Sequence, residues 1–520
     1  MGSNAEANGN NRMTAEQHRV RRVVIVGGGT AGWMTAAALA QQLGGAGLSI
    51  TLVESAAIGT VGVGEATIPH IRDFNRALGI NEAELMARTS ATIKLGIEFR
   101  DWGRIGDAYF HPFGAYGEQI GPAGFHHYWF KAKLAGEARD FGSYCYPIVS
   151  ARNGRFRPPP SARSGLLAFN YAFQFDASLY GAFLADFAQA RGVERKEGKI
   201  TDVIADGASG FIAGVRLESG EEVTGDLFVD CSGFRGLLIE QQLKTGFEDW
   251  SRWLPCNRAW AVPCAIQDPA GPYTRATART GGWQWRIPLQ HRIGNGHVYC
   301  DSYAGDQEAV DLLMANLEGE ALAEPRQLFF TTGKRRRLWN GNCIAIGLSG
   351  GFLEPLESTS IDLIQSGIQN LIGLFPEGGC EAADIDEYNR LMDLEFERIR
   401  DFLMLHYVAN QRDDAPFWRD MREMEWPDSL TAKIEAFRRR GIVPEYEHGL
   451  FLPVSWLSVF IGQNIMPEAC DPRVDRMPDE ELTAHLERIR GTITAAVEAS
   501  GEHLAFLESY GAAFQGAGAA

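Results

Sequence analysis

The stretch that decides the fold is VVIVGGGTAGWMTAAAL, residues 23–39. Its first four residues are β-branched and apolar, which predicts a buried strand over residues 22–26, and its Ala/Leu-rich end predicts a helix to about residue 43. Between them the spacing is Gly-x-Gly-x-x-Gly. The first glycine allows a tight turn, the second lets backbone amides approach a pyrophosphate, and the third lets helix and strand pack closely. The stretch therefore predicts a dinucleotide site at Gly27, Gly28, Gly29, Thr30, Ala31 and Gly32.

A second strand is predicted over residues 50–54. It ends in Glu54, about 20 residues after the last glycine, where a carboxylate can accept hydrogen bonds from a ribose hydroxyl. The alternative is a glycine-rich turn that binds nothing. We find no second copy of the pattern after a strand, so we expect one dinucleotide. Residues 226–234 and 342–347 read as apolar strands that end in small residues, which favours the extended FAD, although either can be an ordinary buried strand.

Composition limits the class of protein. The chain has 520 residues, of which 45% are hydrophobic and 11% aromatic, enough for a large core in two closely joined lobes. Its formal charge is -17, and we find no basic run longer than the one that contains Arg335, Arg336 and Arg337. Nucleic-acid binding needs clustered cations for the phosphates, so we expect no nucleic-acid partner.

The eight cysteines form no CxxC pair and no zinc-type spacing with histidine, so we expect reduced thiols and no metal. No stretch approaches the roughly 20 apolar residues of a membrane helix, and the start has no signal-peptide pattern. These observations predict a cytoplasmic protein without a membrane partner. Residues 1–19 are polar and Asn-rich, which predicts a disordered leader, with Met13 as a possible native start.

Three further motifs are GVGEATIP at residues 62–69, WQWRIP at residues 283–288 and FLEPLEST at residues 352–359. Together with GGGTAGW they resemble the flavin-dependent halogenases of the tryptophan halogenase family, in the family's order. The resemblance runs from about residue 21 to residue 420 and includes DCSGFRG at 230–236 and PFW at 416–418.

The resemblance implies an α/β fold, in which an FAD-binding Rossmann-like lobe of the flavin monooxygenase type carries β-rich excursions and a packed C-terminal helical lobe. We place the FAD lobe at residues 20–380 and the mainly helical, substrate-side lobe at residues 381–520. A helical run is expected from residue 384. Its apolar stripe is expected in the core and consists of Tyr388, Leu391, Met392, Ile399, Phe402 and Leu403.

The implied activity is halogenation of an indole or another electron-rich aromatic. The resemblance also implies a partner, a separate NAD(P)H-dependent flavin reductase that supplies FADH2 by diffusion rather than by contact. Oxygen and chloride or bromide then give hypohalous acid, which reaches a lysine beside the substrate. A homodimer is left open. The alternatives are an FAD monooxygenase or oxidase on the same fold, and a flavin-binding protein without catalysis.

Two residues match the family's catalytic positions. Lys94 lies in an apolar stretch that we interpret as helix-like, where a lone lysine is usually a surface residue, but in the family a lysine here receives the hypohalous acid. Burial would lower its pKa and favour the neutral amine. Glu357 matches the carboxylate that stabilises the cationic ring intermediate and removes the ring proton. Its rival is Glu354, three residues earlier.

The cofactor and halide residues also follow from the resemblance. Trp283 and Trp285 alternate on an extended segment, so one strand face can screen the flavin from the substrate, although a packed strand face is the commoner meaning of such a pair. The screen motif also includes Ile287 and Pro288. Further FAD contacts are expected at Ala66, Ile200, Leu348 and Ile361.

The halide is expected at the backbone of Thr359 and Ser360. Well-known tryptophan halogenases have glycine at the second position, so the preference for chloride or bromide stays open. His111 and Phe113 are candidates to clamp a flat ring, or else core aromatics, and Trp456 is a candidate to line the substrate site. Family members that act on free tryptophan carry a segment that binds the ammonium and carboxylate of the amino acid, whereas residues 447–462 are mostly apolar here. We therefore expect an arene without these amino-acid groups rather than free tryptophan; a carrier-bound or peptide substrate remains open.

Overall fold

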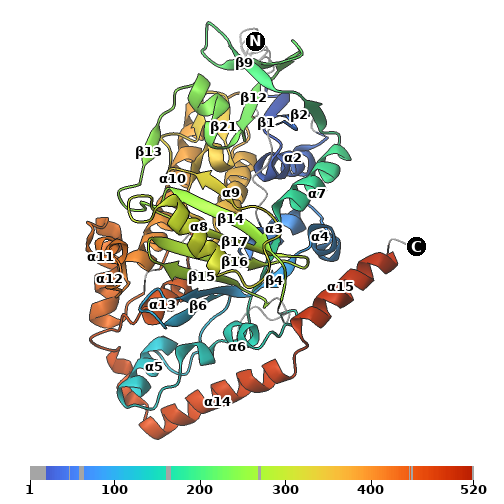
Figure 1. The fold of residues 1–520 in the computed structure, drawn as a ribbon. Helices are drawn as coiled ribbons and strands as arrows, with labels where there is room; N and C mark the ends of the chain where they lie inside the picture. The colour runs from blue at the N-terminus through green and yellow to red at the C-terminus, as the bar shows by residue number, and fades with distance from the viewer. Residues whose placement is uncertain are drawn as a thin grey trace, which may run out of the picture.

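The computed structural model describes residues 19–45, 47–57, 64–159, 165–267, 271–376, 378–443, 445–446 and 449–517, with side chains to residue 510. Apart from Arg19, the leader expected at residues 1–19 lies outside the described residues. Figure 1 shows a parallel sheet in the upper part of the molecule, a large mixed sheet at the centre, and the helices α14 and α15 along the lower edge.

The upper sheet is the one that the opening stretch predicts. β1 (Arg22–Val26) pairs in parallel with β2 (Ser49–Glu54) and with β12 (Leu227–Asp230), and the strand order is β20-β21-β12-β1-β2-β8. Both later apolar segments are therefore strands of this sheet, as expected. The other members are β8 (Glu194–Glu197), β20 (Trp339–Asn340) and β21 (Cys343–Ala345).

Helix α2 (Thr30–Leu43) connects β1 to β2 and packs on α7 (Ala177–Gln189) and α9 (Ser360–Gly373). Small buried alanines on α2 allow this close approach. The turn before the helix requires glycine, because Gly27 has φ +113° and a Cβ there would lie 2.3 Å from the carbonyl oxygen of Cys231.

The strand β12 ends in a carboxylate that fixes the next turn. Asp230 is fully buried, and its side chain accepts hydrogen bonds from the backbone N–H groups of Ser232, Leu238 and Ile239 at 2.8 to 2.9 Å. Leu238 and Ile239 lie in the first turn of the short helix η3 (Leu237–Gln242), so the carboxylate satisfies donors that a helix end leaves open.

The central sheet has seven strands in the order β18-β14-β17-β16-β15-β5-β6. Its strands are β5 (Gly96–Arg100), β6 (Ala108–Pro112), β14 (Arg258–Cys264), β15 (Thr274–Arg279), β16 (Gly282–Pro288), β17 (Ile293–Tyr299) and β18 (Arg326–Phe329). Three small sheets complete the β structure: β3 (Gly64–Ala66), β7 (Ala172–Asp176) and β4 (Thr92–Lys94); β9 (Ile200–Ala205), β10 (Ile212–Leu217) and β11 (Glu222–Thr224); β13 (Phe247–Asp249), β19 (Gly333–Arg335) and β22 (Gly351–Phe352).

The helix-like interpretation of residues 92–99 is wrong, because Lys94 ends strand β4 and the chain continues into β5. β-branched side chains at Thr92, Ile93 and Ile97 favour extended backbone, and Gly96 at φ +156° stops any helix. The outer edge of β4 is covered by a side chain: the buried imidazole of His503 accepts a hydrogen bond from the N–H of Ile93 (3.2 Å).

Helices account for most of the regular structure after residue 381. α10 (Ala382–Val408) confirms the expected helical run, and its apolar stripe is buried except for the half-buried Leu391. The later helices are α11 (Pro416–Glu423), α12 (Asp428–Arg440), α13 (Pro453–Gly462), α14 (Asp479–Glu498) and α15 (His503–Ala517). One hydrophobic cluster extends from Val20 to Leu507, so these helices pack on the rest of the chain. The division into lobes at residue 380 stays a prediction.

The remaining helices lie between the sheets and on the surface: α3 (His70–Ala77), α4 (Glu82–Thr89), α5 (Phe125–Leu134), α6 (Tyr146–Arg152), α8 (Asp306–Ala315), and the short helices η1 (Phe141–Tyr144), η2 (Gly233–Arg235), η4 (Gly347–Ser349), η5 (Pro355–Glu357) and η6 (Pro472–Arg476). All eight cysteines are unpaired thiols, and six of them are buried. Within the described ranges, no helix is both long and apolar enough to cross a bilayer.

Candidate active site

A cavity of about 860 Å³ begins where β1 meets α2 and extends to the loop before α9. Ten of the eleven residues expected to contact the cofactor line it: Gly27, Gly28, Gly29, Thr30, Ala31, Glu54, Ala66, Ile200, Leu348 and Ile361. The exception is Gly32, where a Cβ would lie 1.9 Å from the carbonyl oxygen of Gly27. Gly32 therefore serves close packing of helix on strand, the part that the motif assigns to its third glycine.

The cavity fits a dinucleotide at its narrow end. A Cβ built on Gly29 would meet no atom within 4 Å, so the backbone at the start of α2 faces open space. First-turn amides of a helix lack intrahelical acceptors and attract an anion such as a pyrophosphate. Glu54 lies beside this turn, close to Gly28, and pairs with Arg195, a cavity residue that the sequence motifs did not reveal.

The two tryptophans of WQWRIP form part of the cavity wall. Trp283 and Trp285 point to the same face of β16, both are buried, and their ring centroids lie 6.1 Å apart. Ile287 continues this face into the cavity. Pro288 does not line the cavity; its carbonyl oxygen accepts a hydrogen bond from the hydroxyl of Thr92 (2.6 Å), which ties the wall to strand β4.

Lys94 lies at the end of β4 with no solvent-exposed surface. Its Nζ donates a hydrogen bond to the hydroxyl of Ser358 (2.8 Å), and Ser358 lines the cavity. Burial lowers the pKa of Lys94 to about 7, although the nearby Glu357 raises it. A neutral, nucleophilic amine is therefore available near neutral pH. Ser358 was not among the expected residues, although it stands inside the PLES motif.

Glu357 lies between two histidines. Its Oε2 is 2.8 Å from Nδ1 of His111 on β6, and its Oε1 is 2.8 Å from Nε2 of His406 on α10. Burial alone would raise the pKa of Glu357, but the two imidazoles lower it to about 2. The carboxylate is thus ionised over the physiological range. His406 was missed because the apolar stripe of its helix carries no sign of a buried polar site.

The rival carboxylate, Glu354, lies in different surroundings. It is fully buried near Tyr407, Trp283 and Cys256, and burial raises its pKa to about 7. The charge that acts on Lys94 is that of Glu357. The geometry therefore joins Lys94 to Glu357 and leaves Glu354 apart from the pair.

The expected halide residues stand at the beginning of α9. Thr359 is the N-cap residue and is buried, while Ser360 is the first helical residue and lines the cavity. Ser358 just before them adopts a left-handed conformation (φ 61°, ψ 38°), which turns the chain into the helix. The first-turn amides and the helix dipole favour an anion at this place, beside the contact between Ser358 and Lys94.

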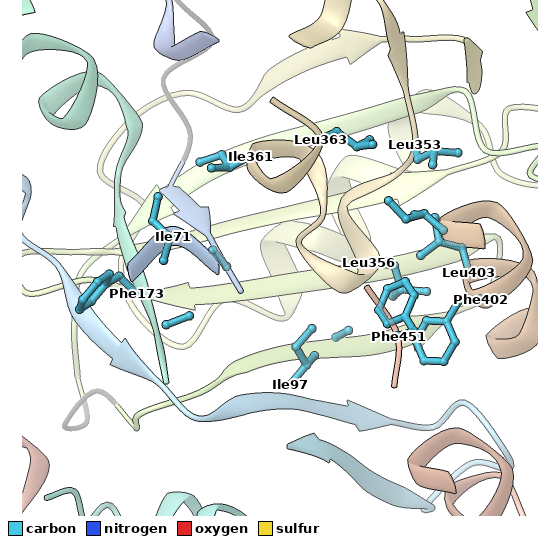
Figure 2. Close-up of a cluster of buried hydrophobic side chains, with 14 of the residues drawn as sticks. Ile71, Ile97, Phe173, Leu353, Leu356, Ile361, Leu363, Phe402, Leu403 and Phe451 are labelled. Atoms are coloured by element: carbon cyan, nitrogen blue, oxygen red, sulfur yellow. The ribbon is translucent and has the colours of Figure 1, made fainter. Parts of the chain in front are cut away.

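An aromatic cluster that does not line the cavity reaches Glu357 through His111. The ring of Phe402 stacks on Phe451 at 3.8 Å and meets Trp456 at 5.2 Å and His111 at 5.7 Å. Figure 2 shows Phe402 and Phe451 packed beside Leu356 of the η5 loop. The half-buried Phe113 completes the surroundings, with its ring centroid 5.4 Å from Nζ of Lys94. The expected substrate residues thus gather around the Lys94 and Glu357 pair.

The fold and this site define a class of protein: a dinucleotide-dependent oxidoreductase whose cofactor cavity has a tryptophan wall and lies beside a buried lysine and carboxylate. The family model for tryptophan halogenases matches residues 22–479, and the chain belongs to this family. A curated relative, tryptophan 6-halogenase ThaL of Streptomyces albogriseolus, is 39% identical over 90% of this chain and 94% of its own length.

Solved structures agree. Xcc4156, a flavin-dependent halogenase from Xanthomonas campestris, superposes with a TM-score of 0.92 at 49% identity, covering 95% of this chain and 98% of that one. BrvH, a flavin-dependent halogenase from Brevundimonas sp. BAL3, gives 0.92 at 46% identity over 95% and 99%. The chain is thus a flavin-dependent halogenase that uses FADH2 and halide to halogenate an indole or another aromatic. Halogenases of this family generally depend on a separate flavin reductase.

Proposed function

We propose that Lys94 and Glu357 carry the halogenation and that the substrate is an indole or a similar electron-rich arene without an amino-acid head. Bound FADH2, with oxygen and halide, supplies hypohalous acid. Lys94 receives the oxidant, either as a haloamine or through a hydrogen bond that polarises it. The carbon–halogen bond forms as the O–X bond, or the N–X bond of a haloamine, breaks. The ring proton passes to the Glu357 carboxylate, which returns it to the departing hydroxide or to the Lys94 amine, so HOX and ArH give ArX and water.

The observation that carries this proposal is the position of Lys94 between two compartments. Its Nζ contacts Ser358, which lines the cofactor cavity, and also lies 5.4 Å from the ring of Phe113 in the aromatic cluster. In this proposal Trp283 and Trp285 keep the organic substrate off the flavin, and the amides of Thr359 and Ser360 hold the halide near the path of the oxidant.

The choice of substrate rests on the aromatic cluster. Phe402 contacts the aromatic rings of Phe451 and Trp456. In the described part of the chain, the cation that lies over the ring of Trp456 is Lys433, and it is paired with Asp401. Glu447 and His448, part of the segment in which we expected no grip on an amino-acid head, lie outside the described residues. Further support comes from the sequence identities, which are 49% to Xcc4156 and 46% to BrvH, both flavin-dependent halogenases, and 39% to the tryptophan 6-halogenase ThaL.

We further propose that an NAD(P)H-dependent reductase supplies FADH2 by diffusion, and that the protein acts in the cytoplasm, where its unpaired thiols would stay reduced.

The test is mass spectrometry of a reaction that contains the protein, FAD, a flavin reductase with NADH, chloride or bromide, and a panel of indoles that includes free tryptophan. Lys94→Ala should abolish the halogenated product and leave FAD binding and oxygen consumption unchanged, while the exposed Lys133→Ala should behave as wild type. Persistent halogenation in Lys94→Ala would refute the role of Lys94. An oxygenated product that forms without halide would indicate a monooxygenase, and an exclusive reaction of free tryptophan would refute the substrate class.

A further inference from the structure

A chain of three buried polar side chains continues from Glu357 into the protein, away from the substrate. Beyond the contact between Glu357 and His406, Nδ1 of His406 lies 2.7 Å from the hydroxyl of Tyr109 on β6. The amide Nε2 of Gln463, at the end of α13, donates to this hydroxyl (3.2 Å) and to the carbonyl oxygen of His406 (2.9 Å). Three separate elements, β6, α10 and α13, thus meet behind the carboxylate.

The donors in this chain determine where the hydrogen on His406 lies. An amide nitrogen can only donate, so the Tyr109 oxygen accepts from Gln463, and the hydroxyl hydrogen is available for Nδ1 of His406. A neutral imidazole that accepts at Nδ1 carries its hydrogen on Nε2. Nε2 and Oε1 of Glu357 lie 2.8 Å apart, in contact but not aligned as a hydrogen bond, and neither atom has a hydrogen-bond partner among the described residues. The opposite tautomer would place a lone pair against the carboxylate.

Glu354 shows what burial does without such a chain. The two carboxylates stand three residues apart, and both are buried. Burial raises the pKa of Glu354 to about 7, whereas Glu357, with His111 and His406 beside it, has a pKa of about 2. The ionisable groups that face Glu357 are Lys94 from β4, His111 and Tyr109 from β6, and His406 from α10. Phe99, Trp102 and Phe402 enclose the remaining faces of His406.

We propose that His406, Tyr109 and Gln463 are positioning residues that keep the Glu357 carboxylate ionised and fixed in orientation, so that it is ready to accept the ring proton. The proposal rests on the proposed role of Glu357. His111 holds the second carboxylate oxygen but lies on the substrate side, against Phe402 and Phe451. The chain from His406 to Gln463 holds the carboxylate from behind, with no group that touches the substrate.

The decisive variant is Tyr109→Phe, which removes the hydroxyl and keeps the ring that stacks on Phe99. Without the hydroxyl, only the Glu357 carboxylate still favours the His406 hydrogen on Nε2, and Nδ1 loses its donor. We expect bromination of indole to fall at least tenfold below wild type at pH 5–6 and to recover toward wild type by pH 8. The C–H/C–D rate ratio for ring-deuterated indole should also rise, because proton removal becomes slower. His406→Phe should show the same effects more strongly.

The matched control is Tyr388→Phe, the same change at a buried tyrosine on α10 whose hydroxyl has no hydrogen-bond partner among the described residues and which does not line the cavity. It should follow the wild-type pH profile. Melting temperatures of all variants separate folding from positioning. A pH-independent loss without a change in isotope effect, or a wild-type profile in Tyr109→Phe, would overturn the proposal. Glu357→Gln is measured in parallel: if it still brominates indole at the wild-type rate, the proposed role of Glu357 fails instead.

Discussion

Replacement of Lys94 by methionine should end halogenation and make the stability of the protein depend differently on pH. The ammonium form of Lys94 is disfavoured in the folded protein, where burial lowers its pKa from 10.5 to about 7. Between these values the unfolded chain binds more protons than the folded one, so this residue makes stability rise with pH. Methionine has a similar length and no titratable group.

The magnitude follows from the two pKa values. One pKa unit corresponds to about 1.36 kcal/mol, so the cost of burying Lys94 is about 4 kcal/mol at pH 7 and about 2 kcal/mol at pH 9. Lys94→Met removes this cost but also loses the hydrogen bond to Ser358, which contributes about 1 kcal/mol. We therefore expect the variant to be more stable than wild type by about 3 kcal/mol at pH 7, with the advantage reduced by about 2 kcal/mol at pH 9.

The assay is urea unfolding followed by tryptophan fluorescence at pH 7, 8 and 9, and only the difference between variant and wild type is interpreted. That difference cancels the titration of all other groups. The exposed Lys133→Met is the control, and its difference from wild type should stay constant with pH. A constant difference for Lys94→Met would show that the amine titrates alike in the folded and unfolded chain, and the reasoning about a neutral Lys94 would be refuted.

Substitutions at four other positions test the frame of the site. Gly29→Ala should weaken FAD binding about tenfold in a fluorescence titration and leave the melting temperature of the apo-protein unchanged, because its methyl group enters open space. Gly32→Ala should lower that melting temperature, because its methyl group meets the Gly27 carbonyl. Equal effects of the two substitutions would contradict the assignment of Gly29 to FAD binding and of Gly32 to packing. Asp230→Ala should cost about 3 kcal/mol in urea unfolding, because three buried N–H groups lose their acceptor, and a loss below 1 kcal/mol would refute this. His503→Ala should lower the amount of product formed per oxygen consumed, whereas His503→Gln should retain it, because only glutamine keeps an acceptor for the N–H of Ile93. If the two variants do not differ, His503 does not act by holding strand β4 in place.

The part of the fold that could be predicted is the part in which local sequence decides structure. The glycine spacing at residues 27–32 specifies a turn, and the β-branched residues on either side of α2 specify the paired strands β1 and β2. The WxW motif could be placed on one strand face because strand periodicity is fixed. The helix-like interpretation of the stretch around Lys94 was wrong, because a short apolar run is compatible with either a helix or a strand. The strand that pairs with it, β7, lies about eighty residues away in the chain.

The site was predictable only where a motif carried it. Lys94 and Glu357 stand in motifs that resemble a known family, but neither motif says what lies around the side chains. His406 sits in an apolar helix stripe, and its role depends on an approach of α10 to β6 across nearly three hundred residues of chain. Ser358 stands beside an expected residue, yet its link to Lys94 arises only when β4 and the η5 loop meet. Long-range packing of this kind leaves no local signal.

The imidazole of His503 at the edge of β4 has a practical consequence for handling the gene. The elbow between α14 and α15 lies next to the strand of the active-site lysine, and Tyr146 and Ser500 join their hydroxyls there at 2.9 Å. Shortened expression clones that stop before Ser500 would remove the side chain that covers the edge of β4 rather than a dispensable tail. Affinity tags and fusion partners attached beyond Ala517 leave that elbow in place.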